Sequence, residues 1–184
     1  MKKCFLFLTL VYLLILMKGY FYNFFIHYEE YKKEIEPIGV ENLLLKKIID
    51  NRSNKELTID DIISLSLDIT KKVLSFRIEH NSNNPNVLVD NPYAHCVGYS
   101  IFFTTVCNYL IEKNKLNNNW EAIPKRGELY FLGINIHDYM GLSDFVKHHD
   151  FVCVKNLINK DERKFVDPSL YEFTLIDEIN YYYD

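Results

Sequence analysis

A cysteine at the start of an apolar segment is the residue best placed to do chemistry. Cys96 follows an Asn- and Pro-rich loop, residues 80–95, and opens the apolar stretch 96–114, which predicts a mostly buried helix. The positive end of the helix dipole favours a thiolate there, and the thiolate is the nucleophilic form of cysteine. Gly98 would keep the first turn open, so that an acyl group could approach the sulfur. The alternative is a small buried cysteine that merely begins a helix.

A histidine and an aspartate are expected near each other. Residues 150–158 and 163–167 predict two antiparallel strands, with His149 at the start of the first and Asp167 at the end of the second. Both then lie at the open end of one hairpin. A carboxylate at this place can fix the imidazole tautomer and stabilise the imidazolium. Each residue alone has an ordinary explanation, but with Cys96 they supply a nucleophile, a base and an orienting acid.

Three segments resemble the motifs of transglutaminase-like cysteine enzymes. CVGYS, residues 96–100, resembles the nucleophile segment, in which Cys and Gly are followed by an aromatic and a small residue. HDFVCV, residues 149–154, resembles the histidine strand, with Phe151 where the family usually has Trp. FVDPS, residues 165–169, resembles the strand that ends in Asp-Pro-Thr or a close variant. The resemblance covers about residues 88–172, and the three motifs occur in the family's order.

The resemblance implies a fold, a reaction and roles for single residues. The fold would be a transglutaminase-like (papain-like) core, with the nucleophile helix packed on a small antiparallel sheet. Cys96 would be the nucleophile, His149 the general base and acid, and Asp167 its orienting partner. Such enzymes hydrolyse or transfer the acyl group of amide or peptide bonds through a thioester. The sequence has no acidic metal-loop pattern, so we expect no calcium dependence, and we expect no cofactor or metal. The backbone N–H of Cys96 would help to bind the oxyanion, and Asn91 is a candidate for a second donor.

Two other functions remain open on the sequence. An NlpC-type cell-wall amidase also has a Cys before a Gly at a helix start and a histidine on a later strand. Its third residue is usually a second histidine soon after the first, whereas no histidine follows His149 here. A catalytically inactive, membrane-tethered binding domain of the same fold predicts nothing unusual at Cys96.

Other residues near these motifs are expected to be structural. Alternation along a strand would point His148 away from His149. Cys107 and Cys153 are expected in the core, and no Cys-x-x-Cys pair suggests zinc.

The remaining patterns predict helices followed by strands, and hence an α+β fold. Residues 27–50 have a helical pattern broken at Pro37, and Thr58 with Asp61 forms a capping-box signal for a helix to about residue 79. A polar connection, 115–127, precedes a strand at 128–134. The tail after Pro168 is ambiguous. These elements divide the chain into a helical part, 27–80, and a catalytic core, 81–184.

The N-terminal segment and the composition suggest on which side of the membrane this domain lies. The chain has 184 residues and a net charge of −4, so no basic footprint for nucleic acid is present. Residues 4–17 are apolar except for Thr9, after Lys2 and Lys3, which predicts a signal peptide or membrane anchor within residues 1–26. Residues 4–26 would be long enough to span a bilayer. The rest of the chain, with a net charge of −7, is then expected on the extracytoplasmic side, acting on a peptide or protein.

Overall fold

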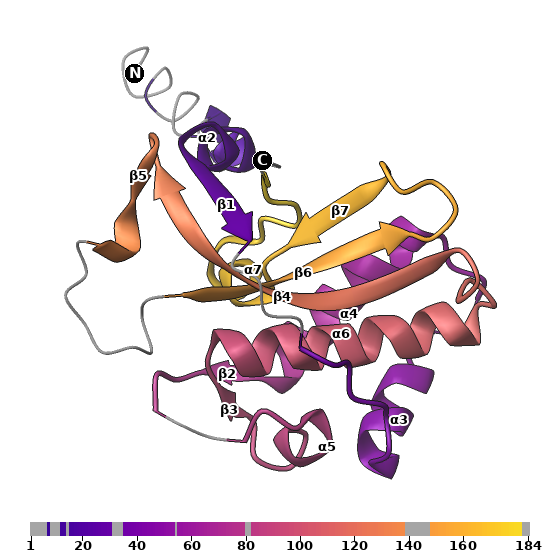
Figure 1. The fold of residues 1–184 in the computed structure, drawn as a ribbon. Coiled ribbons are helices and arrows are strands. Elements are labelled where there is room, and N and C mark those ends of the chain that lie inside the picture. Colours follow the sequence, from indigo (N-terminus) through magenta and orange to yellow (C-terminus); the bar gives the residue numbers. More distant parts are fainter. Residues whose placement is uncertain are drawn as a thin grey trace.

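The computed structural model describes residues 7, 12–13, 15–30, 35–53, 55–79, 82–138 and 148–181. In this part of the chain the fold is α+β, with a curled antiparallel sheet (Figure 1). The helices are α2 (Lys18–Phe25), α3 (Leu43–Asp50), α4 (Ile59–Val73), α5 (Pro85–Leu88), α6 (Cys96–Lys113), the 3-10 helix η1 (Ile136–Asp138) and α7 (Pro168–Thr174). The strands are β1 (Ile26–Glu30), β2 (Ser75–Phe76), β3 (Tyr93–Ala94), β4 (Trp120–Phe131), β5 (Ile134–Asn135), β6 (His149–Asn156) and β7 (Arg163–Val166).

The main sheet has the order β1-β4-β6-β7, and β5 pairs with the end of β4. All of these pairings are antiparallel. In the register, His149 lies opposite Gly127 of β4, and Val152 lies opposite Val166 of β7. Asp167 directly follows β7, so it lies at the end of the sheet at which β6 begins. A short parallel pair, β2 with β3, stands apart and holds the chain just before Cys96.

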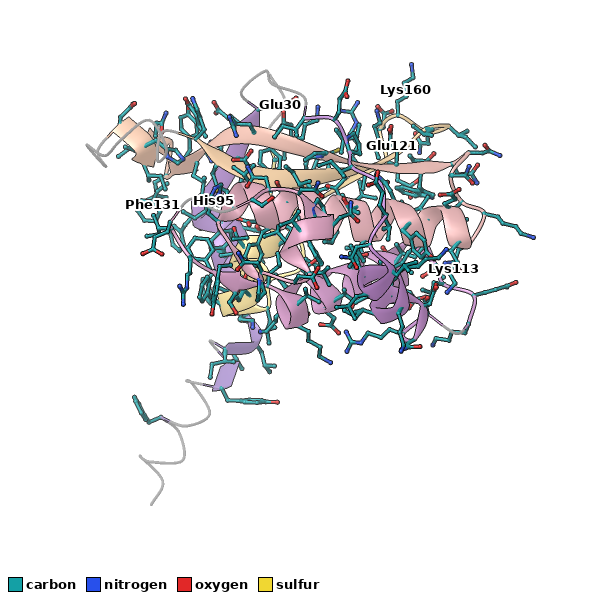
Figure 2. The ribbon with its side chains drawn as sticks, turned by 90° about the horizontal axis from the view of Figure 1, so that it is seen from below. Glu30, His95, Lys113, Glu121, Phe131 and Lys160 are labelled. Carbon is teal, nitrogen blue, oxygen red and sulfur yellow. The ribbon has the colours of Figure 1, made fainter. Side chains whose placement is uncertain are left out.

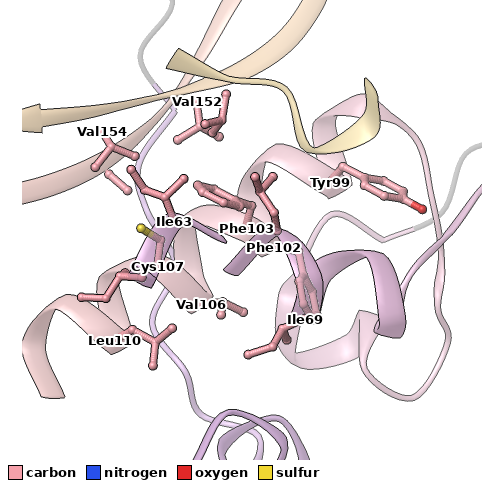
Figure 3. Packing of buried hydrophobic residues seen from close by; sticks show 14 of the residues in the cluster. Ile63, Ile69, Tyr99, Phe102, Phe103, Val106, Cys107, Leu110, Val152 and Val154 are labelled. Carbon is pink, nitrogen blue, oxygen red and sulfur yellow. The ribbon is translucent and has the colours of Figure 1, made fainter. Parts of the chain in front are cut away.

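Helices α4 and α6 cover one face of the sheet. The alternation of β6 sends Val152 and Val154 into this layer, where they pack with Phe103 and Cys107 of α6 (Figure 3). Helix α6 is apolar almost all round. This composition suits its place in the fold, since α4, α5, α7, β4 and β6 all contact it. The buried helix is therefore fixed along its whole length, and so is its first residue, Cys96.

The other face of the sheet holds a smaller, aromatic cluster. Phe151 and Cys153, the alternate residues of β6, pack with Tyr28 of β1, Phe165 of β7 and Ile179 near the C-terminus. The aromatic rings of Tyr28 and Phe151 are 5.3 Å apart in an edge-on arrangement. The two clusters confirm the predicted alternation along β6: Asp150, Val152 and Val154 belong to one face, and His149, Phe151 and Cys153 belong to the other.

A glycine is required at position 127, where β1 pairs closely with β4. A Cβ atom at this position would lie 2.3 Å from the backbone oxygen of Glu29 and 2.7 Å from a ring carbon of Phe151. Any side chain would therefore push β1 away from the sheet. The absence of a side chain lets β1 approach and brings Tyr28 over Phe151.

Helices α4 and α6 begin where the sequence predicts. Thr58 caps α4 with a complete capping box, because its side chain accepts from the Asp61 backbone and Asp61 accepts from the Thr58 backbone. Helix α6 begins at Cys96 as predicted, with His95 as its N-cap.

Five expectations on local structure are wrong. Residues 26–30 form β1 rather than part of a helix, because tertiary pairing with β4 overrides their helical pattern. The expected connection 115–127 contains the first half of β4, which pairs with β6 along its length. Helix α4 ends at Val73, since the chain turns there into β2. The loop 80–95 contains α5 and β3, and Asp167 caps α7 instead of ending a strand.

The predicted membrane segment lies partly outside the described residues. Residues 1–6, 8–11 and 14 are not described, whereas residues 18–25 form α2 and residue 26 begins β1. Within the described residues, no helix is both long and apolar enough to cross a bilayer.

Candidate active site

Cys96 is the first residue of α6 and is partly exposed. A first-turn N–H has no partner inside its own helix, so the backbone of Cys96 is able to donate to a bound group. His95 caps the helix, with Nδ1 accepting from the Val97 N–H at 3.2 Å. Figure 2 shows that His95 lies at the same end of the molecule as Phe131, far from Lys113 at the other end of α6.

His149 and Asp167 form a close pair beside this thiol. His149 Nε2 lies 2.6 Å from Asp167 Oδ2. The His149 side chain is also close enough to Cys96 to lower the pKa of its thiol. Because Asp167 occupies Nε2, Nδ1 is the ring nitrogen left to exchange a proton with the sulfur. The structure therefore brings together all three residues that the sequence assigns to catalysis.

Both oxygens of the Asp167 carboxylate have hydrogen-bond partners. Oδ1 accepts from the backbone N–H groups of Ser169 and Leu170 at 3.0 Å each, and from the Ser169 hydroxyl at 2.7 Å. These bonds make Asp167 the N-cap of α7, and Pro168 fits the first helical position, which needs no N–H donor. Because the helix cap occupies Oδ1, Oδ2 is the oxygen of Asp167 that faces His149.

Tyr28 is a site residue that sequence reasoning missed. Its hydroxyl donates to Asp167 Oδ2 at 2.8 Å, and the Tyr22 hydroxyl lies 2.8 Å from that of Tyr28. Tyr28 is fully buried. Burial, followed by the charge of Asp167, raises its pKa well above the ordinary value, so it stays a neutral donor. Residues 26–30 carry no local signal for this role, because only pairing with β4 brings Tyr28 over the site.

The charges of the site favour a thiolate–imidazolium pair. Burial raises the pKa of the Cys96 thiol, but hydrogen bonds from His149 and His95 and the charge of His149 lower it to about 7. Burial lowers the pKa of His149, but the charge and hydrogen bond of Asp167 outweigh this and raise the pKa well above its ordinary value. Burial raises the pKa of Asp167, yet the His149 charge and the cap hydrogen bonds bring it below the usual range.

A second buried carboxylate approaches the sulfur from the helix-facing side of β6. Asp150 Oδ2 lies 3.9 Å from Cys96 Sγ, and Arg126 of β4 forms an ion pair with Asp150 at 3.1 Å. Burial raises the pKa of Asp150, and the charge of Arg126 opposes this in part. Asp150 in turn raises the pKa of Cys96. No local sequence pattern connects Arg126 with the site, because it lies in the expected polar connection 115–127.

A mostly apolar pocket of about 490 Å³ opens over the triad. Cys96, His149 and Asp167 contribute to its lining. His148 also lines it, although alternation predicted that it points away from His149; it precedes the first residue of β6 and is outside the pleat. The other walls are mainly large apolar side chains, including Tyr22, Tyr28, Phe76, Leu129, Leu170 and Phe173.

The two remaining sequence candidates lie outside the lining of this pocket. Asn91 is exposed in the loop before β3. Gly98 is buried, and a Cβ atom there would come within 2.7 Å of the Ala94 Cβ, so the glycine allows the preceding loop to pack on α6. Cys107 and Cys153 are buried as predicted, and burial raises their thiol pKa values to about 12 and about 11.

The described residues contain no cluster of three or more His, Cys, Asp or Glu side chains suited to hold a metal ion. The arrangement is a thiol with a lowered pKa, an imidazole beside it and a carboxylate that holds the imidazole, under a mostly apolar pocket. Comparison with known proteins finds no matching family model, curated protein or solved structure.

Proposed function

We propose that this protein is a transglutaminase-like thiol enzyme that cleaves or transfers the acyl group of an amide or peptide bond. The observation that carries the proposal is the continuous set of contacts from the Cys96 thiol through His149 to Asp167 Oδ2. A nucleophile, a base and an orienting group in hydrogen-bonding contact are the recurrent arrangement of acyl-transfer enzymes. The α+β fold, with the cysteine at the start of a buried helix and the histidine on a strand, fits a transglutaminase-like core.

The geometry supports a two-step reaction. The Cys96 thiolate attacks the carbonyl carbon, and the negative oxygen of the tetrahedral intermediate accepts from the Cys96 backbone N–H. The C–N bond then breaks while imidazolium His149 gives its proton to the leaving amine, which leaves a thioester on Cys96. Water or a second amine attacks the thioester, His149 takes the proton from it, and the thiolate is released.

Two observations favour this function over the alternatives. Asp167 occupies the third position of the triad, where an NlpC-type amidase usually has a histidine. An inactive binding domain has no need of a thiol with a pKa of about 7 beside a histidine. We place the enzyme on the extracytoplasmic side, exported or anchored through the apolar N-terminal segment.

Labelling with an iodoacetamide probe at neutral pH tests the proposal. The full chain is expected to be labelled at Cys96 much faster than a free thiol of ordinary pKa, and Cys96→Ala is expected to abolish the fast reaction. Cys107→Ala is the matched control, because Cys107 is buried with a raised pKa. A Cys96 that reacts no faster than an ordinary thiol would contradict the mechanism. Profiling with peptide amides, with and without an added primary amine, then separates hydrolysis from transfer.

A further inference from the structure

Helix α2 presents its polar side chains and Tyr22 to the domain, and its other aromatic side chains to the outside. Lys18 donates from Nζ to the Thr174 carbonyl, and Asn23 donates to the Glu178 carbonyl at 3.0 Å. Asn23 also accepts from the Asn180 N–H at 3.0 Å. The polar side chains therefore hold α2 against the C-terminal segment of the domain.

The outward side of α2 is aromatic and unburied. None of the eight residues of α2 is buried, and the side chains of Tyr20 and Phe24 are each 66% exposed. This is the reverse of a surface helix in a water-soluble domain, which turns its apolar side inward and its polar side outward. The exposed side of α2 is therefore suited to an apolar environment.

Two other segments extend this surface. The Phe25 carbonyl accepts from the Leu132 N–H at 3.0 Å, and the rings of Phe25 and Phe131 are 6.0 Å apart. An open hollow of about 670 Å³ joins these segments to the end of α7, because residues of all three line it. We call residues 19–26, 131–136 and 173–176 together the apolar face. Figure 1 shows α2 beside the β4–β5 hairpin, on the side of the molecule away from α3 and α5.

The apolar face as defined contains no charged residue, and Lys18, which also lines the hollow, lies directly before it. Its 18 residues have no Asp, Glu, Lys or Arg, although 25% of the whole chain is charged. Its hairpin turn has Leu132 at a positive φ of 51°, where Asn, Asp or Gly would be favoured, and this leucine side chain is exposed. An exposed apolar surface of this size and kind indicates a site of contact with a membrane or another protein.

We propose that the apolar face lies on the surface of a lipid bilayer and holds the domain in a fixed orientation there. The chain itself favours lipid over a protein partner, because residues 4–17, directly before α2, are apolar except for Thr9. The fourteen residues 4–17 would extend only about 21 Å even as a helix, which is too short by itself to cross the hydrocarbon core of a bilayer. The aromatic residues of the apolar face supply the interfacial contacts that Tyr and other aromatic side chains make at headgroup level.

This orientation has a consequence for access to Cys96. Tyr22 and Phe173 line both the hollow of the apolar face and the pocket over the triad. When the apolar face lies on the bilayer, the pocket lies beside the lipid surface. A substrate held at the membrane then reaches the pocket without leaving the interface.

Tryptophan quenching in phosphatidylcholine vesicles tests the orientation with the full chain. Ile134→Trp puts a probe on the apolar face, and Ile158→Trp puts one on the β6–β7 turn, where the side chain is 75% exposed. Lipids brominated on the acyl chains quench only tryptophan that enters the bilayer. Relative to the native chain, which has Trp120 alone, the Ile134→Trp signal is expected to lose about half or more of its intensity, and the Ile158→Trp signal almost none.

A second substitution checks that the apolar face itself causes the effect. Adding Phe24→Glu to the Ile134→Trp chain is expected to reduce the quenching, because a carboxylate is costly in the interface. Val87→Glu, an exposed change on α5, is the matched control and is expected to leave it unchanged. Equal quenching at both probes overturns the proposal. So does an Ile134→Trp probe shielded from aqueous acrylamide but not quenched by lipid, since a second copy or another protein would then cover the face. The readout needs no activity, so its outcome is independent of the proposed function.

Discussion

Each oxygen of the Asp167 carboxylate has a separate partner set. Oδ1 is bound by the first turn of α7, while Oδ2 accepts from Tyr28 and pairs with His149. The carboxylate therefore cannot rotate without breaking the helix cap, and the imidazole orientation is fixed in turn. This rigidity is what a triad needs, because the base must keep one tautomer and one direction during proton transfer.

The pH dependence of Cys96 alkylation follows from its pKa. The thiolate reacts, so the rate is expected to rise with pH through an inflection near 7 and then to level off. In His149→Ala the hydrogen bond and positive charge that lower the pKa are lost, while burial and Asp150 still raise it. The inflection is then expected to move toward or beyond the ordinary value of 9.0. Peptide-resolved mass spectrometry measures the rate at Cys96 alone. His137→Ala, on the wall of the same pocket, should keep the inflection near 7, and an unmoved inflection in His149→Ala would contradict the ion-pair model.

Tyr28→Phe is expected to reduce the free energy of unfolding at neutral pH by about 1.5–3 kcal/mol, because it removes the buried hydrogen bond to the Asp167 carboxylate together with the hydroxyl contact to Tyr22. Asp167 has a lowered pKa, so this contribution is present above the unfolded-state pKa and is lost only as the pH falls through the lowered folded-state value. Urea unfolding measures the difference. Tyr171→Phe is the matched control: its hydroxyl donates to Asp68 at the same 2.8 Å but in an exposed place, so about 1 kcal/mol or less is expected. Equal losses in the two variants would show that the Tyr28 bond has no special weight.

At the scale of elements, β1 decides whether the site is complete. It lies at the edge of the β1-β4-β6-β7 order and delivers Tyr28 to Asp167. Its contact with the sheet depends on Gly127, where no side chain fits between the Glu29 backbone and the Phe151 ring. A single glycine on β4 thus controls a hydrogen bond to a carboxylate that follows β7.

Gly127→Ala is expected to lower the free energy of unfolding by about 1–3 kcal/mol, because the new methyl group overpacks the β1–β4 contact. It should also increase amide hydrogen exchange in residues 26–30, since β1 is displaced. Gly39→Ala is the matched control: nothing lies within 4 Å of its Cβ position, so a change within about 0.5 kcal/mol is expected. If exchange in β1 were unchanged in Gly127→Ala, the strand would not depend on the close approach.

On the scale of the whole molecule, the two ends of the described chain form one unit. The Tyr28 N–H donates to the Asn180 carbonyl at 3.1 Å, and Tyr28 and Tyr181 form a parallel bridge. The ring of Tyr181 stacks on that of Phe165 at 4.4 Å. Strand β1 and the C-terminal segment therefore pack together around the aromatic cluster on the second face of the sheet, the face away from α6.

Asn23→Ala removes two hydrogen bonds that join α2 to the C-terminal segment. The expected loss in the free energy of unfolding is about 1 kcal/mol, because both bonds are exposed to water. Amide exchange at Ile179 and Asn180 should become faster, as measured by hydrogen-exchange mass spectrometry. Asn118→Ala, in the exposed turn after α6, should change neither quantity. Unaltered exchange at both amides would show that the segment is held without α2.

Local patterns in the sequence predict the features that depend on neighbouring residues. The start of α6 at Cys96, the cap of α4 at Thr58 and the two strands that carry His149 and lead to Asp167 all follow from local periodicity and capping. The same patterns predicted an α+β fold, and the motif order predicted that Cys96, His149 and Asp167 meet. The proposed reaction stays a prediction.

The other residues that complete the site become visible only in the folded chain. Tyr28 is 139 residues from Asp167 along the chain, and its segment has a helical pattern that pairing with β4 overrides. Arg126 lies in a stretch that reads as a polar loop, yet the register of β4 with β6 places it opposite Asp150. Strand pairing over long separations leaves no periodicity in the local sequence, because its free energy comes from side chains and backbone groups far away in the chain. The partners of a local motif are therefore visible only when the sheet is assembled.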